Sequence, residues 1–321
     1  MIWVSWRQQR TETLIAAFVL VLLAALLVPT GLHMASVYDR DGLATCSAQS
    51  SVSCSQAVGA FLQRFDALNA LIGWFNLIPG VIGILLAAPF ILELDSGTYK
   101  LCWTQSVTRR RWLAGKLGMT IAAALLAALV MTALMTWWRA PLDHLEGRMQ
   151  TSVFDFEGIV GFGYVLFALG LALAIGAVWR RAVPALIIAF AGYTVARIFV
   201  QGWLRERYES PLSATWQAAK RAPGPNLAHA WVIDEQPSDR AGHALTQPGL
   251  NAIQACSGAA TGGVRRMDPS CLVARGGGYM HAVFQPASRF WLFQGIETAL
   301  FGGIGLACIL FAAWWVHERT S

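Results

Sequence analysis

The sequence predicts an all-α polytopic membrane protein with six transmembrane helices. Hydrophobic residues make up 56% of the 321 residues and charged residues only 13%, whereas a soluble domain carries roughly a quarter charged residues. The apolar residues gather in six runs, each close to the roughly 20 residues that a helix needs to cross a bilayer. The basic residues lie between these runs and form no single stripe with interleaved aromatic residues. The net charge of +6 therefore does not indicate nucleic-acid binding.

The six predicted spans follow one another along the whole chain. They are Leu14 to Ala35, Leu71 to Leu92, Leu117 to Trp138, Ile159 to Trp179, Val183 to Trp203 and Phe290 to Val316. The first run could be a secretory signal peptide, but its apolar core is too long, and no small-residue cleavage site follows before His33 and Tyr38. We therefore expect an uncleaved membrane anchor.

The distribution of Lys and Arg predicts the orientation, because these residues are retained on the cytoplasmic side. One set of short connections and ends holds ten of them: Arg7, Arg10, Lys100, Arg109, Arg110, Arg111, Lys116, Arg180, Arg181 and Arg319. The alternate set holds only four: Arg40, Arg64, Arg139 and Arg148. Both termini are thus predicted to be cytoplasmic. Residues 1–204 then hold spans one to five, residues 205–289 an extracytoplasmic segment, and residues 290–321 the sixth span with a short cytoplasmic tail.

The N-terminal residues MIWVSWRQQR place Ile2, Trp3 and Trp6 on one helical face and Arg7 and Arg10 near the other. This pattern predicts an interfacial helix that lies on the inner leaflet before the first span. A start of that same span, anchored by Trp and Arg, explains the pattern equally well.

The cysteines agree with the predicted orientation. Cys46 and Cys54 fall in the first outer connection, and Cys256 and Cys271 fall in the long outer segment. An even number in an oxidising compartment indicates disulfides, and the local pairs Cys46–Cys54 and Cys256–Cys271 close the shortest loops. Four unpaired cysteines are the alternative. No CxxC or HExxH pattern indicates a metal site, and we expect no cofactor on this chain.

The outer segment, residues 205–289, is polar and rich in proline, with a glycine run at residues 276–278 and no long periodic stretch. We expect a small, loop-rich cap, because about 80 residues are long for a bare loop. Substrate handling and simple shielding of the outer mouth both remain open for it.

The connection between the second and third spans, Glu93 to Lys116, is the longest cytoplasmic segment and reads ELDSGTYKLCWTQSVTRRRWLAGK. Ser106 or Thr108 can cap a short helix that includes the arginines. A loop that only determines topology would explain those arginines, but not the aromatic residues Trp103 and Trp112. We therefore expect a soluble partner to dock on this connection.

This connection resembles that of the permease subunits of ABC-2-type ATP-binding cassette exporters, particularly those of actinobacteria. In that family the second span ends in E-x-x-x-G-T, and a Ser/Thr-rich turn, an arginine and a G/V-K pair follow. The matching residues are Glu93, Gly97, Thr98, Ser106, Thr108, Arg109, Arg111 and Lys116. MIWVSWRQQR and the run QPASRFWLFQGIETALF, Gln285 to Phe301, are also similar to actinobacterial members. The outer segment matches less well, which leaves the substrate open.

The resemblance implies a subunit of the bacterial cytoplasmic membrane whose coupling helix sits in a cleft of a separate ATPase subunit. Closure of two ATPase subunits would rock two permease copies, in a homodimer or a related pair, between inward- and outward-facing states. The implied ATPase-coupling residues are Glu93, Gly97, Thr98, Trp103, Ser106, Thr108, Arg109, Arg110, Arg111 and Lys116. The chain has no G-x-x-x-x-G-K-[ST] loop, so ATP and Mg²⁺ would bind the partner ATPase, and this chain would not be an enzyme.

Two ionisable residues fall inside predicted spans: Arg197 in the fifth and Glu297 in the sixth. A buried charge costs a few kcal/mol, and the antiparallel spans place both residues at similar depth. We expect a structural salt bridge, with a direct role on the translocation path as the alternative. Glu157, at the outer start of the fourth span, is interpreted as interfacial.

Other functional classes fit the sequence less well. A non-transporting sensor or immunity protein that acts through its cap fits the six spans, but it leaves residues 93–116 without a role. An intramembrane enzyme is disfavoured, because Ser288 and His281 lie at the outer edge without a supporting pattern. A secondary transporter would show an internal repeat and interrupted helices, and neither is evident.

Overall fold

The structure, a computed structural model, describes residues 2–46, 52–99, 108–217, 227, 229–254, 271 and 278–319. The chain divides into two compact units. The first comprises Met1–Leu145, Thr151–Arg205 and Trp291–Ser321, and the second comprises Glu146–Gln150 and Glu206–Phe290.

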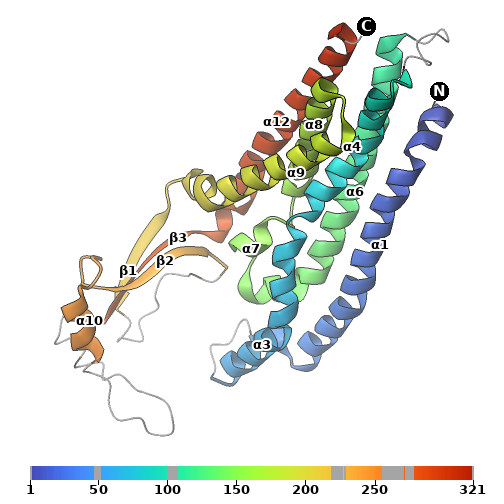
Figure 1. The fold of residues 1–321 in the computed structure, drawn as a ribbon. Helices are drawn as coiled ribbons and strands as arrows, with labels where there is room; N and C mark the ends of the chain where they lie inside the picture. Colours follow the sequence, from blue (N-terminus) through green and yellow to red (C-terminus); the bar gives the residue numbers. More distant parts are fainter. Residues whose placement is uncertain are drawn as a thin grey trace. The chain divides into compact units, whose positions relative to one another are not determined.

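The first unit is a bundle of long helices (Figure 1). Its helices are α1 (Ile2–Arg40), α2 (Leu43–Cys46), α3 (Val52–Phe75), α4 (Ile78–Ser96), α6 (Arg109–Glu146), α7 (Thr151–Phe154), α8 (Val160–Trp179), α9 (Ala182–Phe199) and α12 (Phe290–Arg319). Among the described residues, six helical stretches are long and apolar enough to cross a membrane: Leu14–Arg40, Ile78–Ser96, Arg109–Glu146, Val160–Trp179, Ala182–Arg207 and Ala287–Arg319. The predicted all-α membrane architecture with six spans is confirmed.

Both ends of the chain lie at one end of this bundle (Figure 1). The end of α4, the start of α6 and the turn between α8 and α9 lie toward the same end. We call it the inner end, after the predicted cytoplasmic location of the termini, and we call the opposite end the outer end.

The second predicted span, Leu71 to Leu92, begins too early. In the structure α3 ends at Phe75 and α4 begins at Ile78, so the predicted span joined the end of one helix to the next. Pro79 lies in the first turn of α4, where its missing N–H costs no helical hydrogen bond. The prediction failed because the apolar residues continue through the turn, so hydropathy alone does not mark it.

The N-terminal residues form no separate interfacial helix. α1 is continuous from Ile2 to Arg40 and includes Pro29. The chain therefore runs into the first span without a turn, which corresponds to the second of the two alternatives. No glycine or proline lies between Ile2 and Leu14 to interrupt the helical hydrogen bonds.

The third span is longer than the predicted Leu117 to Trp138, because α6 runs from Arg109 to Glu146. Arg109 to Lys116 form the first turns of this helix. The backbone N–H of Trp112 donates to the Thr108 carbonyl at 3.1 Å, so Thr108 is the residue at which the helix starts. Residues 100–107, which include Trp103 and Ser106, lie outside the described residues, and the separate coupling helix stays a prediction there.

Glycines bring α8 close to its neighbours. A Cβ atom on Gly170 of α8 would lie 2.2 Å from the carbonyl oxygen of Gly305 in α12, and one on Gly83 of α4 would lie 2.6 Å from the Val165 carbonyl oxygen. Helices in a bilayer associate through close packing of small residues, because lipid supplies little hydrophobic driving force between them. The bundle therefore requires glycine at these contacts.

We expect Gly170→Leu to force α8 away from α12 and to lower the free energy of unfolding by about 1–3 kcal/mol, the usual cost of overpacking. The measurement is the thermal unfolding midpoint of the purified protein in detergent. Gly303→Leu on α12 is the matched control, because a Cβ atom there meets nothing within 4 Å. Equal midpoints for the two variants would contradict the assigned packing.

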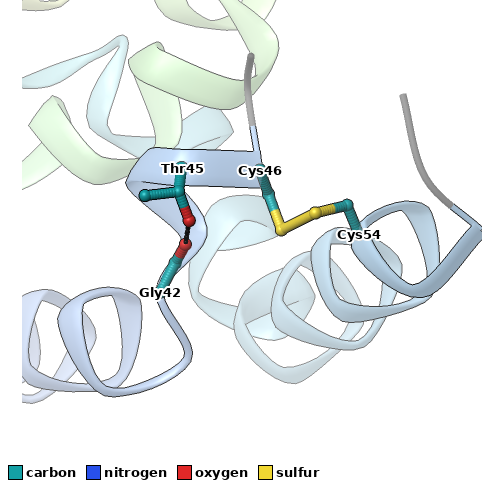
Figure 2. The surroundings of a disulfide bond; sticks show 4 residues. All are labelled: Gly42, Thr45, Cys46 and Cys54. Atoms are coloured by element: carbon teal, nitrogen blue, oxygen red, sulfur yellow. Dashed lines mark hydrogen bonds between the residues drawn. A yellow bond between two sulfur atoms is a disulfide. The ribbon is translucent and has the colours of Figure 1, made fainter. Parts of the chain in front are cut away.

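The predicted disulfide between Cys46 and Cys54 is confirmed (Figure 2). It joins α2 to α3, and the two Cα atoms lie 5.2 Å apart. The hydroxyl of Thr45 in α2 donates to the carbonyl of Gly42 at 2.7 Å, and Gly42 lies in the turn that leads from α1 to α2. Cys271 is also disulfide-bonded. Cys256 lies outside the described residues, so its pairing with Cys271 stays a prediction.

The second unit contains a three-stranded antiparallel sheet in the order β1-β3-β2, where a loop-rich cap was expected. The strands are β1 (Leu212–Gln217), β2 (Trp231–Ser238) and β3 (Tyr279–Gln285), and the helix α10 spans Gln247–Gln254. Ala230, Ala282 and Phe284 form its small core. The sheet was not predicted from the sequence, because its strands are short and the register between β2 and β3 shifts between Val232 and Asp234.

Candidate functional site

An ion pair between Glu93 and Lys116 joins α4 to α6 at the inner end. The Lys116 side chain is only 1% exposed, and that of Glu93 is 13% exposed. The Lys116 ammonium also lies 5.7 Å from the centre of the Trp112 ring, a cation–π distance. Glu93 and Lys116 belong to the residues predicted to serve ATPase coupling, and the structure brings them together where the connection leaves and re-enters the bundle.

An aromatic cluster surrounds this ion pair. The Trp112 ring is stacked with Phe90 at 5.7 Å between centroids and lies 6.5 Å from Tyr99. Trp112 and Tyr99 are both buried. Trp112 is therefore part of the packing between α4 and α6, and its burial explains why an aromatic residue stands among the arginines.

The turn after α4 directs the chain out of the bundle. Gly97 closes the helix with φ of 72°, a left-handed conformation that favours glycine. The hydroxyls of Ser96 and Thr98 lie 3.1 Å apart just beyond it. Thr98 is exposed, so this predicted coupling residue is accessible at the start of the connection.

The three arginines at the start of α6 have different surroundings. Arg109 donates from Nη1 to the His317 carbonyl at 3.3 Å, and Arg110 donates from Nε to His317 Nε2 at 3.4 Å. Both thus contact α12, a placement that the sequence did not reveal. Arg111 is exposed.

A network of buried charges lies toward the outer end of the bundle. Its members are Asp155, Tyr164, Arg197, Arg205 and Glu297, each at most 5% exposed. Arg197 and Glu297, the two charges expected to pair, lie 3.3 Å apart from Nη1 to Oε1. The other three residues were not predicted.

Arg205 contacts both carboxylates of this network. Its Nη2 lies 2.7 Å from Glu297 Oε1, its Nε lies 2.9 Å from Glu297 Oε2, and Nη2 also pairs with Asp155 Oδ1. Arg197 Nη2 lies 2.8 Å from Asp155 Oδ2. Two guanidinium groups thus face two carboxylates, and this balance allows charges to be buried that would be very costly alone.

Neutral and aromatic groups complete the network. The Tyr164 hydroxyl lies 2.9 Å from Asp155 Oδ1 and 2.6 Å from Glu297 Oε1. The Arg197 guanidinium lies 3.6 Å from the centre of the Tyr164 ring and donates to Asn76 Oδ1 at 3.3 Å. The network therefore links the turn between α3 and α4 with α8, α9, α12 and the segment before α8.

A π-helical turn, Val200–Leu204, brings Arg205 into the bundle. The backbone N–H of Arg205 donates to the Val200 carbonyl, a wider turn than that of the α-helix, and such turns are frequent at functional sites. The predicted outer segment started at Arg205, whereas the first unit includes this residue. The fifth span therefore ends about one turn later than Trp203.

The Asp155 carboxyl is held ionised. Burial raises its pKa, but the charges of Arg197 and Arg205 and hydrogen bonds from Arg197 and Tyr164 outweigh burial, so the pKa lies below its usual value. A lowered pKa in the folded state means that this carboxylate stabilises the fold above its unfolded pKa. That contribution is lost as the pH falls through the lowered folded value.

A second buried pair lies between Arg139 and Glu157, neither of which is exposed. Arg139 Nε lies 3.9 Å from Glu157 Oε1 and 3.2 Å from Asp143 Oδ1. Glu157, interpreted from the sequence as interfacial, is thus buried inside the protein, and its depth in the membrane stays a prediction. The sequence did not reveal this burial, because α6 continues beyond Trp138 and carries Arg139 to a position where it faces Glu157. Among the described residues, no group of three or more His, Cys, Asp or Glu side chains could hold a metal ion.

Comparison with known protein families identifies a matching family. A family model described as ABC-2 membrane transporter related matches residues 17–205. This range contains spans two to four, all but the first three residues of the first span and all but the last two of the fifth. It also contains the Glu93–Lys116 pair and all members of the buried network except Glu297. No curated protein and no solved structure matches the chain. Because the match covers more than half of the 321 residues, the chain belongs to the ABC-2 membrane transporter related family.

Proposed function

We propose that this chain is the permease subunit of an ABC exporter, which moves its substrate with energy from ATP hydrolysis in a separate ATPase subunit. The observation that carries the proposal is the buried Glu93–Lys116 pair. It joins α4 and α6 on either side of the connection that would dock on the ATPase.

The packing at the inner end supports transmission of a movement from this connection. The ion pair and the ring contacts of Trp112 hold α4 and α6 together, so a displacement of the connection would move both helices. Asp95 Oδ2 of α4 accepts a hydrogen bond from the Ala182 N–H at 3.0 Å, and Gly83 lies against the backbone of α8. A movement of α4 would therefore reach α8 and α9.

The other components are part of the same proposal. ATP and Mg²⁺ would bind to the ATPase, because the sequence has no phosphate-binding G-x-x-x-x-G-K-[ST] loop. A second permease copy, identical or related, would complete the transporter. A non-transporting sensor or immunity protein is disfavoured, because family membership supports a transporter subunit.

The test is a pull-down in mild detergent with a tag at the C-terminus, with the recovered ATPase measured by mass spectrometry and ATP hydrolysis. The variant is Thr98→Arg with Arg111→Glu, two exposed residues at the ends of the connection. The control is Arg40→Glu, an exposed arginine at the outer end of α1.

We expect the native chain and the control to recover the ATPase. The double variant should recover at least about tenfold less ATPase than the native chain, which corresponds to a loss of about 1.4 kcal/mol in binding free energy. The thermal unfolding midpoint should stay unchanged, since neither exposed residue takes part in the Glu93–Lys116 pair. A native chain that recovers no ATPase at any nucleotide concentration would contradict the proposal.

A further inference from the structure

Arginines from three separate segments gather around the last turn of α12. Arg109 and Arg110 of α6 contact His317, and Arg180, at the turn between α8 and α9, donates from Nη2 to the Arg319 carbonyl at 3.3 Å. Arg181 follows directly and is exposed. We call Arg109, Arg110, Arg180, Arg181 and Arg319 the α12 arginine cluster.

Membrane topology alone does not explain this convergence. The retention of basic residues on the cytoplasmic side depends on their number in each connection, and not on whether they meet around one helix end. Arg180 also occupies a position with φ of 53°, where glycine is favoured. Arginine at this strained backbone position indicates a function for the guanidinium group.

The cluster keeps an excess of positive charge. Its nearby carboxylates are Glu318, which lies 2.9 Å from His317 Nδ1, and Asp95, which accepts the Ala182 N–H. Within the part of the chain that the structure describes, five guanidinium groups therefore lie near these two carboxylates, each of which already has a partner. An anion would be attracted to the cluster.

The surface next to the cluster is apolar and aromatic. Trp179 is 54% exposed and Trp314 is 51% exposed, and the Arg319 guanidinium lies 5.7 Å from the centre of the Trp315 ring. Further along α12, Leu306 and Leu310 are exposed. Tryptophan at the level of basic residues is typical of the headgroup region of a bilayer, and exposed leucines beyond it are suited to acyl chains.

We propose that the α12 arginine cluster binds the phosphate headgroup of an anionic phospholipid, whose acyl chains lie along Leu306 and Leu310. Arginine forms paired hydrogen bonds with phosphate oxygens, and basic sites between membrane helices bind anionic headgroups. A lipid fits better than a soluble anion or an acidic protein, because the apolar surface continues directly from the arginines. The inference goes beyond transport, and it holds whichever substrate is moved.

The test uses the purified full chain in detergent, with added phosphatidylglycerol or zwitterionic phosphatidylcholine. Native mass spectrometry measures the bound lipid, and the thermal unfolding midpoint measures stabilisation. We expect phosphatidylglycerol to bind and to raise the midpoint, and phosphatidylcholine to do neither. The variant Arg180→Gln/Arg181→Gln/Arg319→Gln should bind phosphatidylglycerol about 100-fold more weakly, given the usual contribution of each basic residue near an anionic headgroup.

Two further variants separate binding from folding. The control Arg40→Gln/Arg64→Gln/Arg240→Gln removes three exposed arginines outside the cluster and should leave lipid binding unchanged. Arg180→Gly removes one guanidinium but suits the left-handed backbone, so it should weaken lipid binding about fivefold without lowering the midpoint of the lipid-free protein.

Three results would overturn the proposal. The first is equal phosphatidylglycerol binding by the cluster variant and the control. The second is equal stabilisation by free glycerol phosphate at the same concentration, which would indicate a site for soluble anions. The third is a loss of ATPase recovery by Arg180→Gly with unchanged lipid binding, which would assign the cluster to the protein partner.

Discussion

Glu297→Leu is expected to lower the free energy of unfolding by about 3–5 kcal/mol, the usual cost of removing one partner from a buried ion pair. Glu297 contacts both Arg197 and Arg205, so its loss leaves these two guanidinium groups with Asp155 as the one carboxylate of the network. A protein of ordinary stability, roughly 5–15 kcal/mol, would lose a large part of that margin. The measurement is the thermal unfolding midpoint in detergent, together with the amount of folded protein recovered from membranes.

A charge-balanced double variant tests the reason for this loss. Glu297→Leu with Arg205→Leu removes one charge of each sign and leaves the pair between Arg197 and Asp155 at 2.8 Å. We expect this variant to be clearly more stable than Glu297→Leu, because apolar replacement of a whole buried pair is often neutral. A double variant as unstable as Glu297→Leu would show that charge balance is not what stabilises the network.

Glu93→Leu is the second variant with a large expected effect, again about 3–5 kcal/mol. In the native protein Glu93 is the ion-pair partner of Lys116. The variant leaves the Lys116 ammonium without this carboxylate, buried next to Trp112 between the ends of α4 and α6. The ends of the two helices would separate, so we expect ATPase recovery in the pull-down to fall together with the unfolding midpoint.

Exchange of the two charges separates a structural effect from a specific contact. Glu93→Lys with Lys116→Glu keeps an ion pair between α4 and α6 and should restore most of the unfolding midpoint. If the exchange also restores ATPase recovery, the pair acts by holding the helices together. If the unfolding midpoint returns but the ATPase is not recovered, the proposal that the pair acts by holding α4 and α6 together is contradicted. That result would indicate that Glu93 or Lys116 contacts the ATPase directly.

The sequence predicted well those features that depend on local composition. The six apolar runs gave the six spans, because crossing a bilayer demands length and hydrophobicity from each segment separately. The short separation between Cys46 and Cys54 predicted their disulfide, because nearby cysteines meet at low entropic cost. The similar depth of Arg197 and Glu297 could be counted from the ends of their spans.

The residues that the sequence missed lie next to the predicted ends of spans. Asp155, Arg205 and Arg139 were assigned to connections, where charged residues are ordinary. The only signal was their position within a few residues of a span, and this signal does not distinguish a buried charge from an interfacial one. Their burial depends on where the neighbouring helices end, on the π-helical turn before Arg205, and on the extension of α6 past Trp138.

The sequence by itself determined the membrane class, the number of spans and the family resemblance, because each depends on the chemistry of one segment read along the chain. Only the tertiary structure decided which charges share one network, which arginines meet at the end of α12, and that three distant segments pair as a sheet in the second unit. These features depend on contacts between segments far apart in sequence. A single sequence records the residues that make such contacts, but not the distances between them.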